Sequence, residues 1–428
     1  MYRWENIIKR IGSRRGIVTS RLLIGATFVA QAATVGGTHA GLTYHRLDGN
    51  RLVEGQGAFP NVKPVDLSFI KPVRWVVGVP MGADSLWVVV LADDSVQAVV
   101  LRGREAGLIE NFEPRQLAGP PALVSDGDHV SVLVPAGHAS ALSHPTPIPR
   151  QRRIAYVSAR GRLLLASLRG SQLFEMSPKV LPDARVLADE AGRLLLLSDP
   201  TTRYAHGVLG DAVESASMTL VDAGGAPTIE SRIEFPAPFV FEGIAPLWVD
   251  WNRDARREIV ATLSSGGSGA QLVLYAEDGK RLAESPAIGT GNRWRHAIAV
   301  APFGPGGEME LAEVLTPHLG GTVQFYQWRK NRLERVARLG GYTSHVYGSR
   351  NLDMAVAGDF DGDGRIELLL PNQPRDRLAG IRRTASNAKV AWEASLPAPL
   401  TSNIGSVMLE SGRIVVAVGL ADGTLRFW

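Results

Sequence analysis

The chain has 428 residues, of which 45% are hydrophobic and 21% charged, and it contains no cysteine. This composition excludes an intrinsically disordered chain and a polytopic membrane protein, and the lack of cysteine excludes disulfides, thiolate metal sites and a cysteine nucleophile. The formal net charge is +4, but residues 1–32 alone carry +5, so the remainder is close to neutral at −1. A near-neutral body offers no electrostatic footprint for nucleic acid, and no nucleic-acid partner is expected.

Residues 1–32 have the layout of a secretory signal peptide. Basic residues precede an apolar stretch over 22–33, and Ala30, Gln31 and Ala32 form a small-x-small cleavage site. The pair Arg14 and Arg15 also resembles the twin-arginine type, which carries folded proteins across a bacterial membrane. Because the apolar stretch is shorter than the ~20 residues of a membrane span, cleavage is favoured over an uncleaved anchor. We expect a periplasmic or secreted protein with no membrane span after cleavage.

Beyond residue 70, short apolar strands alternate with turns rich in glycine, aspartate, asparagine and proline. The clearest repeat unit has a strand at 354–358, a polar turn at 359–365 and a strand at 366–370, then two further strands. First strands of such units are expected near residues 75, 122, 185, 247, 297, 354 and 406. Four strands in about 50 residues are typical of one β-propeller blade. The sequence therefore predicts an all-β, seven-bladed β-propeller over 71–428, without the helices of an α/β fold.

The last unit has only three strands, at 406–409, 413–418 and 424–428. A blade that lacks its outer strand would leave an open sheet edge, which invites aggregation. The N-terminal segment 33–70 contains a stretch with strand character at 41–47 that has no partner in the first blade. We predict that this stretch closes the ring; the alternative is a disordered N-terminal tail.

An acidic loop follows the first strand of the clearest unit, with carboxylates at loop positions 1, 3, 5 and 9. Three carboxylates within five residues repel one another unless a cation gathers them, and calcium takes six to eight hard oxygen ligands. Gly364 permits the sharp turn that lets a backbone carbonyl face the ion. An EF-hand would need a carboxylate at position 12, which is Leu370. The candidate ligands are Asp359, Asp361, Asp363, the carbonyl of Arg365, and Glu367.

A strand, the pattern DxDxDGxxE and a second strand within a repeated sheet resemble the FG-GAP/VCBS repeats of the integrin α-subunit β-propeller. The resemblance is strong over 354–370, fair over 247–263, and architectural elsewhere. It implies that the loop between the first and second strands binds calcium as a structural ion, whereas the alternative is a solvated acidic turn without metal. A second calcium is possible at 250–258, where Ala255 replaces the glycine, and none is expected at 302–310. The candidate ligands of the second loop are Asp250, Asn252, Asp254 and Glu258.

In a propeller, the loops that enter first strands and those that join second to third strands share the face opposite the acidic loops. Two units place histidines, arginines and amides there, beside Trp294 and Tyr347. The predicted ligand rim consists of Arg295, His296, His318, His345, Arg350 and Asn351. Such residues suit an anionic or carbohydrate ligand. The resemblance implies that partners bind on the same face, so we expect a protein or polysaccharide partner. We expect a binding or scaffolding module, monomeric or part of a larger assembly. The alternative is a periplasmic enzyme that acts on sugars through this rim, although no HExxH, GxSxG or phosphate-loop motif is present.

Overall fold

The computed structural model describes residues 38–428 except 127–128, 135–136 and 169. The predicted signal peptide at 1–32 therefore lies outside the described residues. Within the part of the chain that the structure describes, no helix has the length and apolar character needed to cross a membrane.

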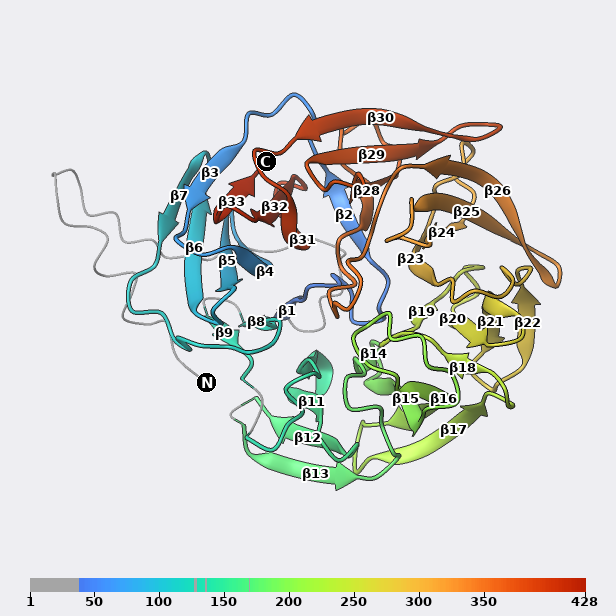
Figure 1. Ribbon diagram of the computed structural model, residues 1–428. Coiled ribbons are helices and arrows are strands. Elements are labelled where there is room, and N and C mark those ends of the chain that lie inside the picture. The colour runs from blue at the N-terminus through green and yellow to red at the C-terminus, as the bar shows by residue number, and fades with distance from the viewer. Residues whose placement is uncertain (1–37, 127–128, 135–136, 169) are drawn as a thin grey trace, which may run out of the picture.

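The described chain is almost entirely β-structure, and the helical exception among these residues is a short 3-10 turn at Pro149–Gln151. The predicted all-β class is confirmed. β-Branched, leucine and aromatic residues fill the inner strands, and turns with glycine or aspartate separate them. Figure 1 shows antiparallel units arranged as a ring around a central axis, which is the architecture of a β-propeller.

We number the units 1 to 8 around the ring. Unit 1 contains β4 (Val73–Met81), β5 (Asp84–Leu91), β6 (Val96–Arg102) and β7 (Glu105–Leu108). Unit 2 contains β1 (Thr38–Gly41), β8 (Leu123–Asp126) and β9 (His129–Val132). Unit 3 contains β10 (Thr146–Ile148), β11 (Arg153–Val157), β12 (Leu163–Ser167) and β13 (Gln172–Met176). Unit 4 contains β14 (Leu187–Ala188), β15 (Arg193–Thr201), β16 (Glu214–Asp222) and β17 (Thr228–Glu234).

The second half of the chain continues the pattern. Unit 5 contains β19 (Leu247–Val249), β20 (Glu258–Ser265), β21 (Gly269–Ala276) and β22 (Arg281–Glu284), with β18 (Val240–Phe241) linking it to unit 4. Unit 6 contains β23 (Arg295–Ala301), β24 (Glu310–Leu315), β25 (Thr322–Arg329) and β26 (Arg332–Gly340). Unit 7 contains β27 (Val356–Asp359), β28 (Glu367–Pro371), β29 (Arg377–Arg383) and β30 (Ala388–Ser395), with β2 (Leu52–Gln56) beside β27. Unit 8 contains β31 (Leu400–Met408), β32 (Ile414–Leu420), β33 (Thr424–Phe427) and β3 (Val65–Ser68).

The described chain thus has one unit more than the seven predicted, and the unit that was missed is unit 3. Its strands are short, and they lie in the longest interval of the predicted series, between 122 and 185. Unit 2 contributes only the hairpin of β8 and β9 from this interval, because its inner strand β1 comes from the N-terminal segment and pairs with β8. A count based on sequential four-strand repeats therefore merged two units into one.

The prediction that residues 41–47 form the closing strand is wrong, although a later part of the N-terminal segment, the strand β3, does complete unit 8. Residues 42–49 form turns rather than a strand. The fourth strand of unit 8 is β3, which pairs antiparallel with β33 over the register from Val65 opposite Phe427 to Ser68 opposite Thr424. Leu42, Thr43 and Tyr44 are all buried in succession. An outer strand would instead alternate buried with exposed side chains.

Residues 41–57, which we call the axial segment, cross the centre of the ring (Figure 1). The segment hydrogen-bonds to successive inner strands, in the order in which the chain builds them. The Leu47 carbonyl accepts from Ala188 N of β14 at 2.9 Å, and the Asp48 carbonyl accepts from Trp248 N of β19 at 3.0 Å. The side chain of Asn50 then pairs with both backbone groups of Val300 in β23, at 2.9 and 3.0 Å. The axial segment therefore ties units together that are otherwise far apart in sequence.

A buried ion cluster lies beside this segment. Asp353 accepts from Arg51 Nε at 2.9 Å and from Arg185 Nη1 and Nη2 at 2.9 and 2.6 Å. The side chains of Arg51, Arg185 and Asp353 are only 4%, 1% and 0% exposed. The Arg185 guanidinium also lies 4.7 Å from the centre of the Tyr44 ring. Burial alone would raise the pKa of Asp353, but the charges of Arg185 and Arg51 outweigh it and hold that pKa well below its usual range.

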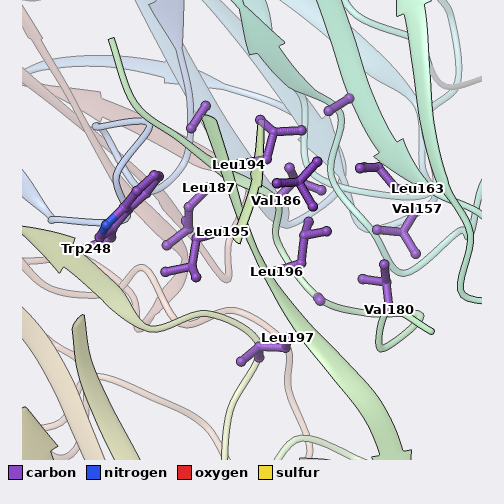
Figure 2. Close-up of a cluster of buried hydrophobic side chains, with 14 of the residues drawn as sticks. Val157, Leu163, Val180, Val186, Leu187, Leu194, Leu195, Leu196, Leu197 and Trp248 are labelled. Atoms are coloured by element: carbon purple, nitrogen blue, oxygen red, sulfur yellow. The ribbon is translucent and has the colours of Figure 1, made fainter. Parts of the chain in front are cut away.

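Apolar side chains fill the space between neighbouring units. Figure 2 shows part of this core, where Val157 and Leu163 of unit 3 lie near Val186 and the leucines of β15. Leu194 to Leu197 are all buried, because both faces of β15 are covered. A strand that is buried on both faces reads as a continuous apolar run rather than an alternating one.

We predict that Asp353→Asn destabilises the protein severely, because it leaves two buried guanidinium groups without a counter-charge. Removing one partner of a buried ion pair costs about 3–5 kcal/mol of unfolding free energy, which urea denaturation at pH 7 measures. Wild-type stability should also fall as the pH drops below 3.8, the ordinary pKa of this carboxyl, because the unfolded state then binds the additional proton. Glu393→Gln, which removes a partner from the exposed pair with Arg377, is the control and should cost less than about 1 kcal/mol. Equal losses in the two variants would contradict this role of Asp353.

Candidate functional site

The predicted calcium loop connects β27 to β28 on one face of the ring. One carboxylate oxygen from each of Asp359, Asp361 and Asp363 lies within 4.8 Å of the others. Within the described parts of the chain, no other group of three histidine or acidic side chains converges so closely. The sequence spacing therefore does bring these three carboxylates together.

Backbone hydrogen bonds hold this loop in place. The two carboxylate oxygens of Asp359 accept from Gly362 N at 2.8 Å and from Gly364 N at 2.9 Å. Gly364 has a φ of +84°, a left-handed conformation that side-chain-bearing residues adopt at a cost. Glu367, the first residue of β28, is buried and accepts from Phe360 N at 3.0 Å. Burial raises the pKa of Glu367 to about 7, in spite of a neighbouring arginine.

That arginine, Arg382, is the residue of this site that sequence reasoning missed. It lies on β29 directly opposite Glu367 in the strand register. Its guanidinium donates to Asp363 Oδ2 at 2.7 Å, to Glu367 Oε1 at 2.9 Å from Nε, and to Asp361 Oδ2. Only the pairing of β28 with β29 could have identified it, because fifteen residues separate Arg382 from Glu367 and no motif links them.

The loop at 250–258 repeats the same backbone pattern in unit 5. Asp250 accepts from Ala255 N at 3.0 Å, and Glu258 accepts from Trp251 N at 2.9 Å, as their counterparts do in unit 7. Ala255 has a φ of +65°, so alanine occupies a left-handed position that favours glycine. The amide of Asn252 donates to Asp254 at 3.1 Å. The two loops therefore share their backbone hydrogen-bond pattern, and the loop at 250–258 does not bring three carboxylates as close together as the loop at 359–367 does.

On the opposite face, three of the predicted rim residues do come together. Trp294 stacks on His296 with a ring-centre distance of 4.9 Å and meets His345 edge-on at 5.0 Å. His318 lies 6.0 Å from His345 and 5.3 Å from Tyr347. Trp294 is 2% exposed and Tyr347 59% exposed. The rings therefore form a continuous series from the interior to the surface.

The other three predicted rim residues have structural partners instead. Arg295 is buried, and its guanidinium pairs with Glu313 at 2.7 and 2.9 Å, because the first residue of β23 points into unit 6. Asn351 is buried and accepts from Asp353 N at 3.1 Å. Arg350 is partly buried and reaches across to unit 4, where it pairs with Asp183 and Asp211. We therefore assign Arg295 and Asn351 to the framework rather than to the exposed rim.

Loops from units 4 and 5 contribute residues that the sequence did not reveal. His206 pairs through Nδ1 with the buried Glu242, and the Tyr347 hydroxyl lies 3.5 Å from the His206 carbonyl. Burial, with the nearby charge of Glu242, raises the pKa of Glu214 to about 9. These residues are separated by tens of positions and belong to no motif, so only the ring arrangement brings them together.

Two histidines of this face, His318 and His345, lack the partners of a proton relay, whereas His206 is paired with Glu242. His345 Nε2 donates to the Ser349 carbonyl at 2.6 Å, while His345 Nδ1 and His318 Nδ1 find no hydrogen-bond partner among the described residues. Burial lowers the pKa of His345 to about 4 and also lowers that of His318. Both rings are therefore neutral near pH 7 and offer aromatic contact, while the histidine of this face that a carboxylate orients is His206.

Comparison with known proteins finds no matching family model and no matching curated protein. The resemblance to FG-GAP/VCBS repeats therefore stays a prediction. Two solved structures are similar in fold. BamB from Moraxella catarrhalis is 13% identical, with a TM-score of 0.47 over 88% of this chain and 99% of that chain. BBS1N, in a structure with ARL6DN, is 11% identical, with a TM-score of 0.40 over 86% of this chain and 97% of that chain.

We predict that Glu214 makes stability fall with rising pH. Its carboxyl keeps a proton up to about pH 9 in the folded state but loses it near the ordinary pKa of 4.5 in the unfolded state. Unfolding then releases a proton, so the free energy of unfolding should decline by up to about 1.4 kcal/mol per pH unit between these limits. Glu214→Gln should flatten this decline in urea titrations from pH 5 to 9, while Glu105→Gln in the exposed strand β7 should leave it unchanged. A slope that survives in Glu214→Gln would refute the assignment.

Proposed function

We propose that the protein is an exported β-propeller that binds a protein or glycan partner through one face of its ring and is stabilised by calcium on the other. The binding face is the aromatic surface, which we define as Trp294, His296, His318, Leu319, His345 and Tyr347. The proposed export rests on the signal-peptide pattern of residues 1–32.

The observation that carries the proposed binding function is the ring series that ends at Tyr347. Tyr347 is 59% exposed and Leu319 67% exposed, and both adjoin His318. Binding hot spots are enriched in aromatic side chains that stand on a well-packed base. Because buried rings support the exposed Tyr347 ring, this side chain would lose little conformational freedom when a partner docks.

Polar contacts keep the loops of this surface in fixed positions. Gln373 donates from its amide to the carbonyls of Pro317 and Tyr342, at 2.8 and 2.9 Å, and so joins the loops of units 6 and 7. The pairs of Arg350 with Asp183 and Asp211 join unit 7 to unit 4. A preorganised surface that ends in the exposed Tyr347 and Leu319 supports binding, and the enzymatic alternative, for which His206 paired with Glu242 would be the oriented base, comes second.

Calcium is the cation that best suits the loop at 359–367. The donor set consists of hard carboxylate oxygens, three of which converge, and Gly364 turns the backbone so that the Arg365 carbonyl can join them. Arg382 already places a stand-in cation against Asp361 and Asp363. The four carboxyl groups outnumber the two arginines of the site, Arg365 and Arg382, so the loop retains an excess of negative charge. A bound calcium would link β27 to β28 and stabilise the fold by an amount that grows with the logarithm of the calcium concentration above Kd.

Calcium should therefore raise the melting temperature of the wild-type protein relative to EDTA. At one hundred times Kd the ion adds about 2.7 kcal/mol to the free energy of unfolding. Asp361→Asn should remove most of the calcium response measured by differential scanning calorimetry. Asp278→Asn changes an isolated exposed turn and should keep the full response. Identical melting curves of the wild type in calcium and EDTA would rule out this part of the proposed function.

Tyr347→Ser should weaken partner binding by about tenfold or more, which corresponds to ~1.4 kcal/mol, without lowering the melting temperature, because its side chain is exposed. The measurement is affinity capture from periplasmic extract, followed by titration of the captured protein or glycan against each variant. Ile229→Ser is the matched control, since Ile229 is an exposed apolar residue on the outer strand β17. Capture that is equal for all three proteins would show that the partner binds elsewhere.

A further inference from the structure

Three units begin their second strand with a buried glutamate, namely Glu258, Glu310 and Glu367. The third strand of each unit places a different residue against this carboxylate. In unit 5 the residue opposite Glu258 is Ala276. In unit 6 the amide of Gln327 donates to Glu310 at 2.9 Å, and in unit 7 the residue opposite Glu367 is Arg382. The same position of the repeat is therefore occupied by an apolar residue in unit 5, a neutral polar residue in unit 6 and a cationic residue in unit 7.

Only in unit 7 does this residue extend into the acidic loop. Arg382 contacts Asp361, Asp363 and Glu367, while Asp359 is held by the backbone amides of the loop and not by Arg382. The Arg382 side chain is only 12% exposed, so water cannot substitute fully for these ion pairs. The guanidinium thus holds two of the three converging carboxylates from the side of β29.

We propose that Arg382 is a built-in counter-ion that competes with calcium for the loop at 359–367. This inference rests on the proposed calcium site. Calcium needs oxygens of Asp361 and Asp363 that the guanidinium now occupies, and two cations at that distance repel each other. Arg382 must therefore release both aspartates when calcium binds, while its Nε hydrogen bond to Glu367 is compatible with either state. The consequence is a loop that keeps its shape without calcium, at the cost of a weaker affinity for the ion.

The test uses the substitutions that the other units already contain. Arg382→Ala copies unit 5, and Arg382→Gln copies unit 6 and retains a donor for Glu367. The control is Arg377→Ala, which removes the same charge from the same strand β29, where the exposed Arg377 side chain pairs with Glu393 and not with the acidic loop. Calcium affinity is measured by isothermal titration calorimetry with calcium chloride, and melting temperature by scanning calorimetry in EDTA and in calcium.

We expect both Arg382 variants to bind calcium at least about tenfold more tightly than the wild type. In EDTA, Arg382→Ala should melt well below the wild type and should recover most of this loss in calcium. Arg377→Ala should change both quantities little. If Arg382→Ala does not fold in EDTA, Arg382→Gln provides the affinity comparison.

The outcomes separate the two proposals. Calcium binding of equal affinity in the wild type and both Arg382 variants would overturn the competition and leave the calcium site intact. No calcium binding by any of the proteins would overturn both the site and the competition. A melting temperature of Arg382→Ala in EDTA equal to that of the wild type would overturn the role of Arg382 as a counter-ion.

Discussion

The ion cluster of Arg51, Asp353 and Arg185 is the constraint on which the arrangement of the ring depends. It joins the axial segment to the inner edges of units 4 and 7, which lie 168 residues apart in sequence between Arg185 and Asp353. Some inner strands, such as β14 and β19, are short, and neighbouring units contact each other mainly through apolar side chains, which do not specify direction. A bidentate guanidinium–carboxylate pair does specify the direction of contact, because its two parallel hydrogen bonds require a fixed geometry. Apolar packing thus stabilises the ring, while the ion cluster and the hydrogen bonds of the axial segment fix the positions of the inner strands around the ring axis.

Unit 7 connects this centre to both faces within a short stretch of chain. His345 and Tyr347 belong to the aromatic surface, Asp353 lies at the axis, and Asp359 opens the acidic loop. The axial segment also ends at this loop. Gly57 N donates to the Asp359 carbonyl at 2.7 Å, and a Cβ at Gly57 would lie only 2.1 Å from the Phe360 carbonyl oxygen. Glycine is therefore required where the two backbones meet.

Most of the features that could be predicted from the sequence depend on patterns within a short stretch of chain. The acidic loop follows from spacing within nine residues, and the gathering of His296, His318 and His345 follows from which loops share a face of a propeller. The count of units failed, because unit 2 takes its inner strand from residues 38–41 and so breaks the sequential repeat. Arg382 and the axial segment could not be predicted, since both depend on strand register or on a path through the ring centre. Interactions between distant segments leave no periodic signal in a single sequence.

The distribution of buried charge explains why the two faces can differ so much in chemistry. The axis is held by its own ion cluster, so neither the acidic loop nor the aromatic surface is needed to close the ring. The loop at 250–258 supports this, because it keeps the backbone pattern of its counterpart although Ala255 is strained there and Asn252 replaces an aspartate. The fold thus tolerates loss of ligands at one loop. By the same reasoning, Tyr347 and Leu319 are free to serve a partner, since both expose apolar area that contributes nothing to the core.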